Sequence, residues 1–167
     1  MFTAASDRNT HGAQDGFTLV ELIITIMLLA ILGVAAFTRL RDSTGPIRLR
    51  AAIDQITSDI ELSKSFAMAR HDTITIVYNS GSDNYQIFSG PTGSRTALSD
   101  FPGSNNGTVS LAGVEYTGVD ISAVSFNGGN ELSFDPWGNA LSGGTVTLNG
   151  TKVITIHSLT GYWEISE

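Results

Sequence analysis

The feature that most constrains this chain is a long apolar stretch near its start. Between Leu22 and Phe37 the only polar side chain is Thr25, and extension back to Phe17 gives a stretch of 21 residues. As an α-helix, such a stretch spans roughly 30 Å, which is the thickness of the hydrocarbon core of a bilayer. A single small domain could hardly surround so long an apolar cylinder. We therefore predict a transmembrane helix over residues 17–38.

A secretory signal peptide is the alternative interpretation of the same stretch. Val34, Ala35 and Ala36 form a small-residue site that signal peptidase could accept, in which case a β-domain would be released after Ala36. Against this, the apolar region exceeds the usual 7–15 residues, and residues 1–16 carry no excess of basic side chains.

Charge is distributed unevenly along the 167 residues. The chain has 16 acidic and nine basic residues, a net charge of −7. Residues 71–167 contain nine acids against only Arg95 and Lys152, which accounts for the whole excess. An acidic surface repels phosphate, so we expect no nucleic-acid binding there. The chain has no cysteine, which excludes disulfides, thiolate nucleophiles and cysteine zinc sites.

The period of the hydrophobic pattern changes twice after the apolar stretch. Gly45 and Pro46 predict a kink or short interruption. Residues 39–70 then read as an amphipathic helix packed on a sheet, with one face made of Leu49, Ile53, Ile56, Ile60, Ser63 and Ala67. From residue 72 the period becomes two, which predicts short strands.

We expect residues 71–167 to form a β-sheet domain built from hairpins. The strands are predicted at 73–78, 85–88, 108–116, 119–126, 131–134, 145–148, 151–157 and 162–165, with a long surface loop over 89–107. Asn149 and Gly150 favour a type I′ turn. The fold class is α+β, with a long N-terminal helix packed on an antiparallel sheet.

The segment at the head of the apolar stretch resembles the signature of type IV prepilins. It reads Gly16-Phe17-Thr18-Leu19-Val20-Glu21-Leu22, so a glycine precedes a phenylalanine and a glutamate stands five residues into the chain that cleavage would leave. The resemblance implies a leader over 1–16, cleavage by prepilin peptidase after Gly16 and N-methylation of Phe17. It also implies that Glu21 pairs with the N-terminus of a neighbouring subunit during assembly. Alone, Glu21 reads as a helix-start residue that the helix dipole favours.

Within the pilin-like proteins, the chain is most similar to minor pseudopilins of the GspH/FimT group. The similarity lies in the helix end Leu62–Arg70 and in Leu132-Ser-Phe-Asp-Pro-Trp-Gly138, which precedes a hairpin, the Thr160-Gly161 turn and a last strand. It implies a structural subunit of a periplasmic pseudopilus in type II secretion, held in the inner membrane by a single pass with residues 71–167 in the periplasm. The implied partners are other pseudopilins, the peptidase and an inner-membrane assembly platform.

Two departures from the family pattern concern the charges around the apolar stretch. Asp15 stands immediately before Gly16, where the family often has a base. The bases that follow the stretch are Arg39, Arg41, Arg48 and Arg50. The positive-inside rule alone would therefore orient the helix the opposite way, so the periplasmic placement rests on the motif.

Two other functions remain open at this point. One is a minor pilin of a type IV or MSHA-like surface pilus, although many of these close a loop with a disulfide. The other is a DNA-uptake competence pilin. Its DNA-binding members carry bases near a C-terminal Gly-Arg-like motif, whereas this tail reads Gly161-Tyr162-Trp163-Glu164.

The sequence shows no catalytic pattern, and we expect neither an enzyme nor a cofactor. His11, His71 and His157 are far apart and fit surface or strand positions. Asp135 and Asn139, with Asn127 and Asn130, are weak calcium candidates because calcium takes oxygen ligands. The same residue types form turns by hydrogen bonding to their own backbone, which is the favoured interpretation. We expect Asp135–Gly138 to be a structural turn, with Trp137 packed on the sheet.

Overall fold

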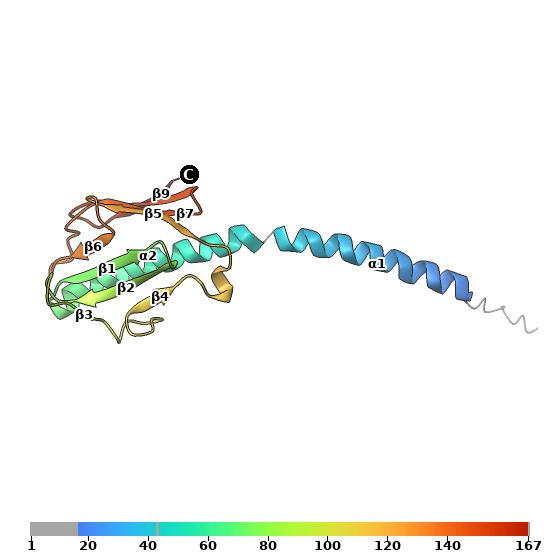
Figure 1. Cartoon of the computed structure of the whole chain (residues 1–167), viewed down its shortest axis with the longest axis horizontal. Coiled ribbons are helices and arrows are strands. Elements are labelled where there is room, and N and C mark those ends of the chain that lie inside the picture. The colour runs from blue at the N-terminus through green and yellow to red at the C-terminus, as the bar shows by residue number, and fades with distance from the viewer. Residues whose placement is uncertain (1–16, 43, 167) are drawn as a thin grey trace, which may run out of the picture. The chain divides into compact units, whose positions relative to one another are not determined.

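The computed structural model describes residues 17–42 and 44–166, with the backbone alone over 35–42. The chain divides into two compact units after Asp42. The first contains the helix α1 (Leu19–Asp42), and the second contains the helix α2 (Thr44–Arg70) and all the strands (Figure 1). The predicted leader, residues 1–16, lies outside the described residues.

The side chains of α1 that the structure describes form no buried face. It is rich in leucine, isoleucine and methionine, and every described side chain from Phe17 to Val34 is exposed. In the part of the chain that the structure describes, no helix is both apolar and long enough to cross a membrane. The transmembrane segment predicted over 17–38 is therefore not confirmed.

The helix α2 has the predicted apolar face and ends at Arg70, but it begins at Thr44, because residues 39–42 belong to α1. Its buried residues are Ala52, Ile53, Ile56, Thr57, Asp59, Ile60, Ser63 and Ala67. Gly45 and Pro46 lie in its first turn, where a proline ring is tolerated because the missing N–H has no helical partner. At the other end His71 is left-handed, with φ 53°, and the amide of Asp72 donates to the carbonyl of Ala67. This is a Schellman termination.

In the described part of the chain, nine strands form two antiparallel sheets. The first sheet has the order β3-β2-β1-β6, with β4 also paired to β2, and the second has the order β5-β7-β8-β9. The strands are β1 (Ile74–Asn79), β2 (Asn84–Ser89), β3 (Thr96–Ala97), β4 (Thr108–Ser110), β5 (Ile121–Phe126), β6 (Glu131–Phe134), β7 (Gly144–Leu148), β8 (Lys152–Ile156) and β9 (Trp163–Ser166).

The hairpins predicted from turn residues are confirmed. Strands β1 and β2 pair antiparallel from Ile74↔Ser89 to Asn79↔Asn84. Between β7 and β8, Asn149 and Gly150 have φ values of 51° and 65°, as a type I′ turn requires. Gly144 is needed where β7 pairs with β5, because a Cβ there would lie 2.2 Å from the carbonyl oxygen of Ser125.

Two predicted segments differ from the structure. Residues 89–107 are not all loop, because Phe88 and Ser89 of β2 pair with Ala97 and Thr96 of β3. The strand predicted over 108–116 ends at Ser110 and is followed by a short 3-10 helix, η1 (Val114–Tyr116). The sequence after Ser110 contains Ala112-Gly113, which breaks the alternation of apolar and polar side chains.

One core joins α2 to both sheets. The apolar face of α2 contacts β1 and β6, and buried side chains of both sheets join the same cluster, including Phe134, Ile121 and Val146. The predicted α+β class, with an N-terminal helix packed on antiparallel sheets, is confirmed.

Among the described side chains, the residues of this core all come from the second unit, so we expect a fragment that starts at Pro46 to be soluble and folded. Circular dichroism should show both the helix α2 and a large β contribution, with one cooperative thermal transition. Aggregation or a disordered spectrum would show that residues before Pro46 are needed for the fold.

Candidate functional site

The residues singled out for processing and assembly lie at the start of α1. Gly16 lies outside the described residues. Phe17 is 83% exposed and precedes the first helical turn, and Glu21 is exposed within that turn. Both side chains are therefore open to another molecule.

The local structure explains why α1 begins at this point. The hydroxyl of Thr18 accepts a hydrogen bond from the backbone N–H of Glu21 at 3.2 Å. A threonine followed three residues later by a glutamate has the spacing of a capping box, which satisfies amides that have no partner in the first turn. The backbone amide of Glu21 is thus capped at the helix start, and the role of its carboxylate in assembly stays a prediction.

The Asp135–Gly138 segment is a turn, as predicted. Oδ1 of Asp135 accepts from the backbone amides of Trp137 at 2.9 Å and Asn139 at 2.8 Å, and Oδ2 accepts from Nδ2 of Asn139 at 3.0 Å. These hydrogen bonds, first the one from Asn139, lower the pKa of Asp135. The two calcium candidates therefore hydrogen-bond to each other. Among the described residues, no group of three or more His, Asp or Glu side chains could hold a metal ion.

The prediction that Trp137 packs on the sheet is wrong. Its side chain is 70% exposed, and the ring meets His71 edge-on, with the centroids 5.9 Å apart. The turn places Gly138 against α2, since a Cβ there would lie 2.9 Å from Met68, and directs the neighbouring indole outward. His157 lies at the end of β8, where it stacks on Tyr162. His11 is outside the described residues.

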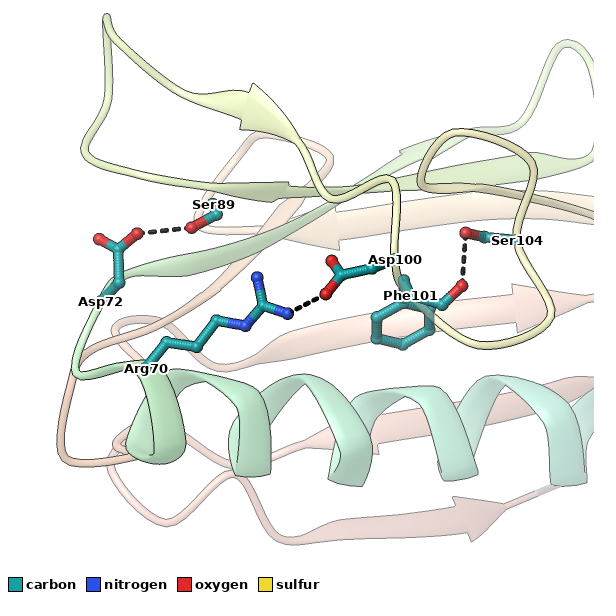
Figure 2. Close-up of polar contacts among 6 residues, drawn as sticks. All are labelled: Arg70, Asp72, Ser89, Asp100, Phe101 and Ser104. Carbon is teal, nitrogen blue, oxygen red and sulfur yellow. Dashed lines mark hydrogen bonds and ion pairs between the residues drawn. The ribbon is translucent and has the colours of Figure 1, made fainter.

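Side chains at the C-terminal end of α2 contact the segment between β2 and β4. Figure 2 shows Arg70 reaching Asp100, with which it forms an ion pair, while its guanidinium lies 4.7 Å from the ring centroid of Phe66. Phe66 also contacts the buried Phe101. The pair lowers the pKa of Asp100 through the hydrogen bond from Arg70. The predicted surface loop is thus anchored at its middle.

The inner face of α2 carries a buried carboxylate that we did not predict from the sequence. Asp59 is 4% exposed, and Oδ2 accepts from the hydroxyl of Tyr85 at 2.6 Å. Nε2 of Gln55 donates to both carboxylate oxygens at 3.0 and 3.1 Å. Burial raises the pKa of Asp59, and these hydrogen bonds oppose the rise. Asp59 stands three residues after Ile56 and four before Ser63, so its position on the inner face was visible in the helical spacing.

The raised pKa gives Asp59 a defined effect on stability. In the unfolded chain Asp59 loses its proton near pH 3.8, whereas in the folded domain it keeps this proton to a higher pH. The contribution of Asp59 to the free energy of unfolding therefore falls as the pH rises from 3.8 through the pKa of the folded state. We expect Asp59→Asn, which keeps an oxygen acceptor for Tyr85, to remove that decline. Urea unfolding of the fragment from Pro46, at about pH 4 and pH 7, measures the difference. An unchanged pH dependence in the variant would contradict the assignment.

Comparison with protein families decides the identity of the chain. The family described as type II transport protein GspH matches residues 52–161, which is well over half of the sequence. The chain belongs to the GspH family. A second family, the prokaryotic N-terminal methylation motif, matches residues 12–37, the part that contains Gly16, Phe17 and Glu21.

Solved structures place the same fold among pilin-like subunits. The minor pseudopilin EpsH from the type 2 secretion system of Vibrio cholerae matches with a TM-score of 0.55 and 8% identity, over 71% of this chain and 94% of that one. The type IV minor pilin FimU of Pseudomonas aeruginosa matches with a TM-score of 0.50 and 13% identity, over 74% and 92%. At these identities the likeness concerns the fold alone.

One curated relative is similar over most of its length. The competence protein ComGD of Bacillus subtilis (strain 168) is 26% identical over 143 residues, which cover 86% of this chain and 85% of that protein. The prediction of a type IV pilin-like protein of the GspH group is thus confirmed. The family and the two solved neighbours are pilin-type structural subunits rather than enzymes.

Proposed function

We propose that this GspH-family chain is a minor subunit of a periplasmic pseudopilus in type II protein secretion. In this proposal prepilin peptidase cleaves after Gly16 and methylates Phe17, and residues 17–38 hold the mature chain in the inner membrane. An assembly platform then moves it into a filament together with other pseudopilins. The sheet domain lies on the periplasmic side, where it meets its partner subunits.

The observation that carries the proposal is the uncovered helix α1. Its described side chains are apolar on all sides except at Glu21 and Thr25, and all of them are exposed. Burial of each large aliphatic side chain stabilises by about 1.5–3 kcal/mol. A helix of this kind therefore favours an apolar environment around its whole circumference, which a bilayer supplies before assembly and neighbouring helices supply in a filament.

A competence pilus is the second candidate, and a specific observation favours it: the similarity to ComGD. The two candidates share maturation and assembly and differ in the machine they serve. Deleting the gene in the native bacterium tests them directly. Loss of exoprotein secretion with normal transformation supports the secretion role. Loss of transformation with normal secretion would overturn it, and loss of surface pili alone would indicate a surface pilus.

Even in a competence system, we expect this subunit not to bind DNA itself. Residues 71–167 carry the whole net charge of −7, so phosphate contacts would have to overcome repulsion. A gel-shift assay at moderate salt should show no complex at micromolar protein. A complex that weakens with salt would contradict this expectation and indicate a DNA-binding role.

A further inference from the structure

The end of the sheet domain where α2 begins combines exposed apolar side chains with arginines. Ile47 in the first turn of α2 is 68% exposed, and Val114 at the start of η1 is 82% exposed. Arg48 and Arg50 flank the same turn, and among the described residues Arg50 has no ion-pair partner. Large exposed aliphatic side chains beside bases are typical of surfaces that contact the interfacial region of a membrane.

Hydrogen bonds join α2 to η1 at this end of the domain. Nη1 of Arg48 donates to the carbonyl oxygen of Thr117 at 3.4 Å, and the hydroxyl of Tyr116 donates to Oε1 of Gln55 at 3.5 Å. Figure 1 accordingly shows the short turn of η1, in yellow-orange, beside the first turns of α2. Ile47, Arg48, Arg50 and Val114 are called the basal surface below.

An apolar groove adjoins the basal surface on α2. It has a volume of about 370 Å³ and is lined mainly by Pro46, Leu49, Ile53 and Ile165, with Arg50, Asp54 and Lys152 also contributing. Among the described residues, the groove lining includes the acid Asp54, and η1 contains the acid Glu115. The carboxylate of Glu115 is turned back over Gly113, where an added Cβ would lie 2.9 Å from Oε1.

The distribution of charge in the domain indicates which kind of partner the basal surface binds. Residues 71–167 carry −7, so an anionic membrane repels most of the domain, whereas Arg48 and Arg50 are attracted. Guanidinium groups also donate paired hydrogen bonds to phosphate. We propose that the basal surface docks on anionic phospholipid headgroups of the membrane that holds the chain before assembly, an inference that rests on the proposed function.

The docking explains why arginines follow the apolar stretch and why Ile47 and Val114 are exposed. These arginines conflict with the positive-inside rule, and contact with anionic headgroups gives Arg48 and Arg50 a role on the periplasmic side of the bilayer. Ile47 and Val114 insert beside the headgroups, so leaving the membrane for the filament includes the loss of these contacts. The attraction acts over about 8–10 Å at physiological salt and weakens at higher ionic strength.

The experiment uses the full mature chain in vesicles. Because the sequence has no cysteine, Val114→Cys accepts a single polarity-sensitive fluorophore. The chain is reconstituted either in phosphatidylcholine or in an equimolar mixture of phosphatidylcholine and phosphatidylglycerol. We expect blue-shifted emission, and quenching by brominated lipid, in the anionic vesicles, with both effects reduced by high salt. Arg48→Gln with Arg50→Gln should lower the docked-to-free ratio about fivefold per arginine, roughly 25-fold together.

A matched control removes two other bases. Lys64→Gln with Arg95→Gln changes the net charge equally. Lys64 lies more than 20 Å along α2 from Arg48 at the helical rise, and Arg95 pairs with Glu131. We expect this variant to dock like the parent. Equal emission in both kinds of vesicle, or an equal loss of docking in both double variants, would overturn the inference. An emission shift that depends on protein density would overturn it too, because it indicates contact with a second copy of the chain. Extraction of the chain by alkaline carbonate from both vesicles would instead contradict the anchoring in the proposed function.

Discussion

Replacing Glu21 with alanine is expected to leave cleavage and membrane retention intact and to abolish entry into filaments. The bond that the peptidase cuts lies five residues upstream, so processing does not depend on the carboxylate. Insertion becomes slightly easier, because a charge inside an apolar segment is unfavourable. Processing and retention are followed by immunoblot, and incorporation is followed in sheared or cross-linked filament fractions.

We expect incorporation to be lost because, in the packed filament, water no longer stabilises the charges. We expect the carboxylate of Glu21 to pair there with the amine of a neighbour's Phe17, and both residues are exposed in the subunit described here. Without the carboxylate that ammonium is buried unpaired, at a cost on the order of 3–5 kcal/mol. Such a cost corresponds to a drop in incorporation of roughly a hundredfold or more.

The variant Thr18→Ala distinguishes the role of the Glu21 charge from the role of the helix cap. This variant removes the hydroxyl that caps the amide of Glu21 but keeps the carboxylate, and such a substitution costs about 1 kcal/mol of helix stability. We expect it to assemble nearly as well as the parent chain. If Glu21→Ala enters filaments normally, or if Thr18→Ala fails as completely, Glu21 acts only as a helix-start residue.

The second large effect is expected at Gly16. A side chain as bulky as leucine would fill the space through which the extended backbone enters the peptidase site, whereas glycine leaves it open. Gly16→Leu should therefore accumulate as an uncleaved form about 16 residues longer than the mature chain. Gly12→Leu, a substitution of the same size elsewhere in the leader, should be processed normally. Efficient cleavage of Gly16→Leu would contradict the predicted processing site.

The fold was largely predictable because local patterns and tertiary packing agree. The spacing of Ile53, Ile56 and Ile60 places them on one face of α2, and Asn149-Gly150 determines a tight hairpin whatever surrounds it. The pilin signature was equally local, since it lies within seven consecutive residues. It gives the expected chemistry of maturation without reference to the rest of the molecule.

The features that were missed depend on partners distant in sequence. The helical spacing places Asp59 on the inner face of α2, but its hydrogen-bond partner Tyr85 lies on a strand 26 residues away. The short strand β3 exists because β2 offers it an edge, and its own two residues carry no periodic signal. Trp137 is apolar and adjoins a strand, yet the hydrogen bonds of Asp135 direct it outward. Solvent exposure at a turn follows from backbone geometry rather than from the residue type.

The N-terminus of the mature protein, purified from the membranes of its own bacterium and identified by mass spectrometry, tests the central claim most directly. We expect the chain to begin at Phe17 and its amine to carry a methyl group. A chain that begins at Phe37, after cleavage behind Ala36, would show instead that the apolar stretch is a secretory signal peptide.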